Sequence, residues 1–84
     1  SITLKRGATY TFDVSDFGNA HPFRFSTTAD GTFGGGTVFN DGVTYVDSGT
    51  ITWTVPENLS ASVMYYFCTL HAGMAGSGVI SITD

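Results

Sequence analysis

Three side chains that bind metals well lie close together near the end of the chain: Cys68, His71 and Met74, spaced as C-x-x-H-x-x-M. They directly follow the apolar run 63–67, and a second imidazole, His21, lies far upstream. Two imidazole nitrogens, one thiolate and a weak thioether form the ligand set of a blue-copper electron-transfer centre. The residue types therefore indicate one copper ion per chain, bound by His21, Cys68, His71 and Met74.

The spacing is also suitable for a single site on one loop. The gap of two residues between Cys68 and His71 allows a tight turn to fold the imidazole back beside the sulfur. A second gap of two residues brings Met74 round the same loop, whose turns are permitted by the glycines Gly73, Gly76 and Gly78. Copper(I) accepts few and soft ligands, and copper(II) would be held in the same cage. Little would then move when one electron is transferred.

Other interpretations of the motif are weaker. A structural zinc site usually has four Cys or His ligands in pairs, and this chain has one Cys. Cys68 could act as a nucleophile with His71 as its base. However, no acid or amide is clearly placed to orient the imidazole, so we expect no enzymatic activity. Met64, four residues before Cys68, is a rival axial ligand, but filling the core is its better interpretation.

The length of 84 residues predicts a single domain, residues 1–84. A chain this short buries only about 60% of the surface that its unfolded form exposes, so its stability is marginal. Because there is one Cys, no internal disulfide can form. A metal ion whose ligands come together only in the folded state would add its binding free energy to stability.

The composition predicts an all-β protein. No helical periodicity runs for ten residues, Gly is abundant (11 residues), and aromatic and β-branched residues dominate the apolar set. The expected strands are 2–6, 9–14, 22–26, one or two within 37–46, 50–55, 63–68 and 76–83. About seven short strands separated by turns predict a Greek-key β-sandwich or barrel.

Charge and hydropathy limit the classes of partner. The net charge is −4, with only Lys5, Arg6 and Arg24 positive, so a nucleic-acid partner is not expected. The sequence contains no stretch of 18 apolar residues, so no membrane span is expected. It also shows no basic segment followed by an apolar one at its start, so no signal peptide is expected. The seven acidic residues favour a basic protein partner and a salt-dependent association rate.

Three segments carry a resemblance to a known family. The chain has H-P-F at 21–23, Y-Y-F-C-T-L-H-A-G-M at 65–74 and G-V-I-S-I at 78–82. Together they resemble the cupredoxins, the type 1 blue-copper proteins, with a C-x-x-H-x-x-M spacing similar to that of amicyanins. The pattern is most similar to short cupredoxin-like domains of marine bacteria and their phages. The resemblance implies equatorial ligands His21, Cys68 and His71 and an axial Met74.

The resemblance also implies a function. A cupredoxin transfers single electrons by cycling between Cu(II) and Cu(I), binds no substrate and acts as a monomer. Its redox protein partners would dock where the edge of His71 emerges, among Ala20, Phe23, Ala72 and Phe33. The periplasm and the thylakoid lumen are the compartments that the resemblance suggests. The alternative is a non-redox structural or adhesion module, on a virion or cell surface, with an incidental copper site. Copper storage or delivery is a third possibility.

One departure from the family concerns the contact between the ligand loops. Plastocyanin-like proteins have Asn after the first ligand His, and its side chain ties the two loops together, whereas this chain has Pro22. Asn19 or Thr69 could make this contact instead.

Overall fold

The computed structural model describes residues 2–16, 22–46, 49–73 and 78–84. These described residues form seven strands: β1 (Ile2–Lys5), β2 (Thr9–Asp13), β3 (Phe23–Ser26), β4 (Val43–Tyr45), β5 (Thr50–Thr54), β6 (Val63–Cys68) and β7 (Val79–Thr83). Each lies within a segment that the sequence predicts to be a strand. The all-β prediction is therefore confirmed.

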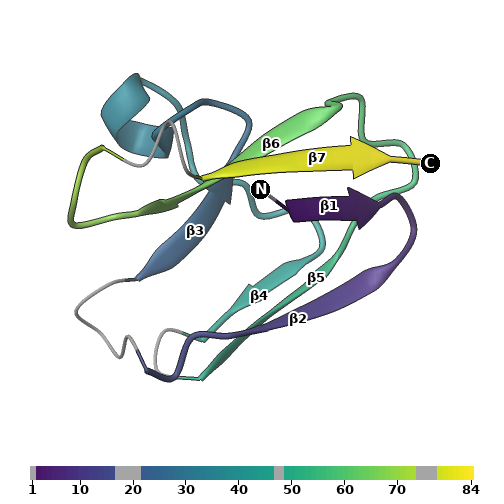
Figure 1. Cartoon of the computed structure of the whole chain (residues 1–84), viewed down its shortest axis with the longest axis horizontal. Helices are drawn as coiled ribbons and strands as arrows, with labels where there is room; N and C mark the ends of the chain where they lie inside the picture. Colours follow the sequence, from purple (N-terminus) through teal and green to yellow (C-terminus); the bar gives the residue numbers. More distant parts are fainter. Residues whose placement is uncertain (1, 17–21, 47–48, 74–77) are drawn as a thin grey trace.

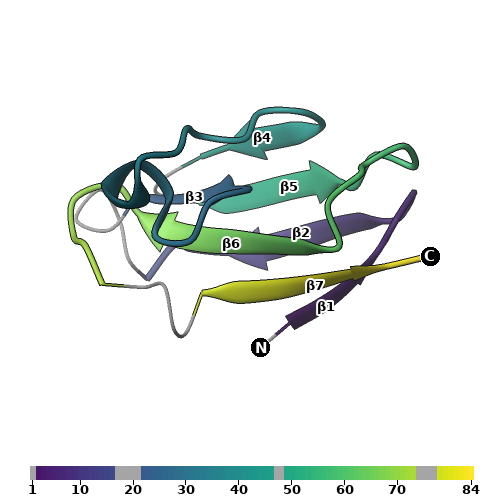
Figure 2. The ribbon, with the colours of Figure 1, turned by 90° about the horizontal axis from the view of Figure 1, so that it is seen from above.

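The strands form two sheets that face each other (Figures 1 and 2), in the orders β1-β7-β6-β3 and β2-β5-β4. Strands β1 and β7 pair in parallel, and the other neighbouring strands pair antiparallel. This arrangement is a β-sandwich, as predicted, and the Greek-key connectivity stays a prediction. Strand β6 lies between β7 and β3, so the strand that leads to Cys68 is interior to its sheet.

The core lies between the sheets, where alternate residues of each strand point inward. In β5, Ile51 and Trp53 are buried while their neighbours Thr50 and Thr54 are exposed, which is the two-residue period of a half-buried strand. Trp53 is fully buried and its ring stacks on that of Phe25, with centroids 4.7 Å apart. The other buried residues of this core are Leu4, Val14, Val55, Met64, Ile80 and Ile82. Met64 is thus a core residue, as expected from the sequence.

The continuous apolar run 63–68 predicts a strand buried on both sides, but part of the outer face of β6 is exposed. Val63 is 40% exposed, whereas Phe67, on the same face, is fully buried. The difference arises from a 3-10 turn, η2 (Gly31–Gly34), whose Gly31 packs against the Phe67 ring. Only the end of β6 that leads to Cys68 is therefore covered on its outer face.

Within the described ranges, no helix is long and apolar enough to cross a membrane.

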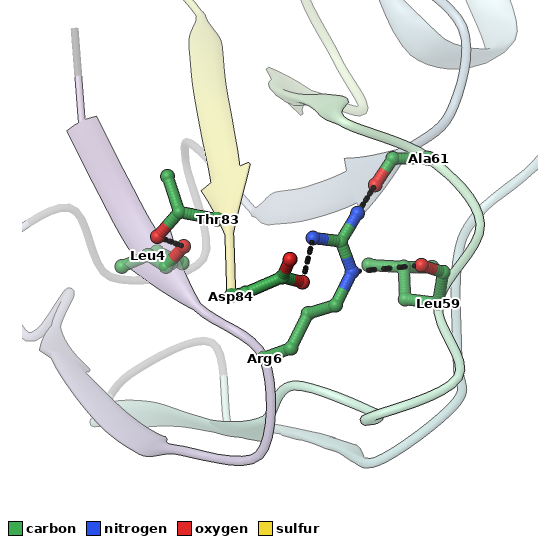
Figure 3. Close-up of polar contacts among 6 residues, drawn as sticks. All are labelled: Leu4, Arg6, Leu59, Ala61, Thr83 and Asp84. Carbon is green, nitrogen blue, oxygen red and sulfur yellow. Dashed lines mark hydrogen bonds and ion pairs between the residues drawn. The ribbon is translucent and has the colours of Figure 1, made fainter.

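Arg6 joins three segments at the end of the sandwich where β1 and β7 finish (Figure 3). Its guanidinium donates to the carbonyl oxygens of Leu59 and Ala61 at 2.9 and 3.0 Å and to Oδ1 of Asp84 at 2.9 Å. The Arg6 side chain is 18% exposed, whereas that of Asp84 is 98% exposed. The two carbonyl bonds should therefore contribute more stability than the exposed ion pair.

Replacing Arg6 with Ala should lower the free energy of unfolding by about 1–3 kcal/mol, because two partly buried carbonyls lose a charged donor. Urea denaturation measures this loss. The matched control is Lys5→Ala, which removes the same charge from the exposed residue that ends β1 and should change stability by less than about 0.5 kcal/mol. Equal effects would contradict a structural role for the Arg6 contacts.

Candidate metal centre

Cys68 and His71 lie on the two sides of a tight turn at the end of β6. Cys68 pairs with Phe23 of β3, and a bridge to His71 then reverses the chain. The amide of His71 donates to the carbonyl of Cys68 at 3.4 Å, which closes the turn. As a result, Sγ of Cys68 and Nδ1 of His71 are 3.4 Å apart. The sequence predicted this turn from the gap of two residues.

The distance between these two atoms fits a shared metal ion. Zinc, whose bond lengths are well defined, binds thiolate sulfur at about 2.3 Å and imidazole nitrogen at about 2.0–2.1 Å. Two such bonds that diverge at a near-tetrahedral angle place their donor atoms roughly 3.5 Å apart. The 3.4 Å between Sγ and Nδ1 agrees with this value. A thiolate and an imidazole are also a donor pair that copper binds well.

The two side chains differ in their access to solvent. Cys68 is 2% exposed, whereas His71 is classed as exposed. Nδ1 of His71 faces the buried sulfur, so the imidazole leads from the interior to the surface. The neighbouring Leu70 is 60% exposed. A buried sulfur is poorly placed to attack a substrate but well placed to bind an ion shielded from water.

The structure shows how the Cys68 turn is tied to the segment that follows His21. The amide of Thr69 donates to the carbonyl of Pro22 at 3.1 Å. Thr69 was one of the two residues that could replace the missing Asn, and it makes the contact through its backbone. The other, Asn19, lies outside the described residues. Thr69, which follows Cys68, is thus hydrogen-bonded to Pro22, which follows His21.

The remaining two predicted ligands, His21 and Met74, lie outside the described residues. In the part of the chain that the structure describes, no three His, Cys, Asp or Glu side chains gather as a metal site. That part contains two members of the predicted set, Cys68 and His71, and it brings them together. The four-residue site as a whole stays a prediction.

A contact that sequence reasoning missed lies beside this turn. Both carboxylate oxygens of Asp30 lie 3.0 Å from the amide nitrogen of Gly73, which donates to them. Gly73 has a φ of 106°, in the left-handed region that favours glycine. Asp30 precedes η2, and in Figures 1 and 2 η2 and the chain after β6 lie at the same end of the sandwich. In the sequence Asp30-Gly31 indicates only a turn, because its partner is 43 residues away.

Comparison with models of known protein families, with curated proteins and with solved structures finds no match.

Proposed function

We propose that this chain is a small electron-transfer protein that binds one copper ion in a type 1 site formed by His21, Cys68, His71 and Met74. The observation that carries the proposal is the 3.4 Å separation of Cys68 Sγ and His71 Nδ1. A thiolate and an imidazole at this distance can bind one ion. The bond from Thr69 to Pro22 is a second support, because it joins the two segments that would supply the ligands.

The protein would hold its metal ligands in place while the charge of the ion changes. Cys68 lies at the end of an interior strand, and its turn is closed by the backbone bond from His71 to Cys68. A copper ion, when bound, supplies the one-electron couple Cu(II)/Cu(I). The contribution of the protein is a site that holds the sulfur of Cys68 and the nitrogen of His71 3.4 Å apart. Such preorganisation keeps the rearrangement on electron transfer small.

The surface around His71 fits a partner that docks briefly. His71 and Ala72 are exposed, Leu70 is 60% exposed, and Phe33 of η2 is 47% exposed at the same end of the sandwich. The net charge of −4 favours a basic redox protein. We propose that such a protein docks over this end, that electrons pass through the edge of His71, and that the chain works as a monomer without enzymatic activity.

Copper titration of the purified protein tests the proposed function. Cu(II) should bind at one ion per chain and produce the intense visible charge-transfer band of a thiolate-bound type 1 site. Ascorbate should bleach the band, and ferricyanide should restore it. Zn(II), which can bind the same ligands but has no redox chemistry, should give no band. A colourless protein after copper addition would contradict the proposal and favour a structural or adhesion module.

A further inference from the structure

We propose, on the basis of the copper function above, that Asp30 is the positioning residue of the ligand loop. Its carboxylate accepts a hydrogen bond from the amide of Gly73, one of the two residues between His71 and Met74 in the motif. This contact fixes the loop from a residue outside the proposed ligand set. Asp30 thereby keeps the imidazole of His71 beside the sulfur of Cys68.

Asp30 is itself held firmly. Its backbone is left-handed, with a φ of 60° and a ψ of 15°, and its carbonyl accepts the amide of Phe33 at 3.1 Å. The next residue, Gly31, donates its amide to the carbonyl of Thr28 at 2.9 Å. These backbone hydrogen bonds on both sides restrict the Asp30 backbone. The Cα from which its carboxylate side chain extends is therefore held in place. This segment is further joined to β3, because the amide of Thr28 donates to Oγ of Ser26 at 3.1 Å.

The same segment also contacts the strand before the ligand turn. Gly31 packs so closely on Phe67 that a Cβ at position 31 would lie 2.3 Å from the ring. Phe67 immediately precedes Cys68, and Gly73 follows His71 by two residues. The segment 30–31 therefore holds the chain on both sides of the Cys68–His71 turn. A displacement of this segment would move both donor residues.

The contact between Asp30 and Gly73 should order the 71–73 segment more than it raises the free energy of unfolding of the whole domain. The bond from an amide to a charged carboxylate is stronger than a bond between neutral groups. Gly73 is exposed, however, so water competes for both partners. Losing the carboxylate should accordingly loosen the 71–73 segment locally and change global stability much less.

Two measurements on the metal-free protein test this role, in the wild type, Asp30→Ala and Asp30→Asn. We expect hydrogen exchange of the Gly73 amide and alkylation of Cys68 by iodoacetamide to be at least about tenfold faster in Asp30→Ala. In Asp30→Asn the amide oxygen still accepts one bond, so both rates should lie between those of the wild type and Asp30→Ala. Asp41→Asn, at an exposed position in the turn before β4, should leave both rates unchanged.

A comparison with Arg6→Ala separates local loosening from general destabilisation. Arg6 acts at the opposite end of the sandwich, so its loss should speed alkylation only through global unfolding. Faster alkylation in Asp30→Ala should depend weakly on urea, as local opening does, whereas that in Arg6→Ala should depend strongly on it. Unchanged Gly73 exchange in Asp30→Ala, or alkylation that follows global stability in both variants, would overturn the proposal.

A third measurement uses copper. If the proposed function is right, Asp30→Ala should shift the visible band and the EPR spectrum of the copper-loaded protein, and Asp41→Asn should not. An unshifted spectrum would overturn the role of Asp30 at the metal. If the wild type gives no copper band while Gly73 exchange responds to Asp30, the proposed function fails and the positioning of the Cys68–His71 turn by Asp30 stands.

Discussion

Replacing Gly31 with Ala should lower the free energy of unfolding by about 2–5 kcal/mol, because two penalties add. The new Cβ would lie 2.3 Å from Cδ1 and Cε1 of Phe67, whose side chain is fully buried and cannot swing into solvent. The φ of 52° at position 31 adds strain for any residue with a Cβ. A domain of this size has roughly 5–10 kcal/mol of stability in total, so the variant should be close to unfolding.

Gly35 provides the matched control for this substitution. Its φ of 88° imposes a similar backbone strain, but no atom of the described residues lies within 4 Å of a Cβ built there. Gly35→Ala should thus lower the free energy of unfolding by only about 1–2 kcal/mol. Urea denaturation of both variants separates packing from backbone strain. Equal losses would contradict the close packing of η2 on β6.

Copper should stabilise the wild-type protein strongly, and Cys68→Ser should remove that effect. A ligand that binds only the folded state at about 1,000 times its dissociation constant adds about 4 kcal/mol. For a domain below 100 residues this gain corresponds to a rise in Tm of roughly 15–30 °C. Thermal unfolding followed by circular dichroism, with and without copper, measures the rise. Each variant is compared with its own metal-free form, because Ser at a position 2% exposed also changes stability without metal.

A chelator gives the reverse of this result. Removing copper from the loaded wild type should return its Tm to the metal-free value, whereas Cys68→Ser should show the same Tm with copper, without copper and after chelation. Asp41→Asn, away from the proposed ligands, should retain the full rise with copper. A wild-type Tm that does not respond to copper would contradict a ligand set assembled by folding.

The strands could be predicted because their signal is local. In β5, the alternation of Thr50, Ile51, Thr52, Trp53 and Thr54 indicates a strand with one buried face, and the structure buries Ile51 and Trp53. The run that forms β6 was predicted equally well as a strand. Its burial was predicted less well, because the exposure of Val63 depends on where η2 covers the sheet.

The candidate site could be predicted only in part. The spacing of Cys68 and His71 indicated a turn that places sulfur beside nitrogen, because both residues belong to one short segment. The contact of Asp30 with Gly73 could not be found this way, since it joins segments 43 residues apart in the chain. Thr69 was named as a residue that could tie the two loops, but the sequence did not indicate that its backbone would make the bond.

The most direct test is a crystal structure of the copper-loaded protein, with the ion located by anomalous diffraction at the copper edge. We expect one ion per chain, about 2.0–2.3 Å from Sγ of Cys68 and Nδ1 of His71. The imidazole of His21 should complete the plane, and the sulfur of Met74 should lie at a longer distance. An ion bound elsewhere, or a His21 imidazole that does not contact the ion, would contradict the proposed site.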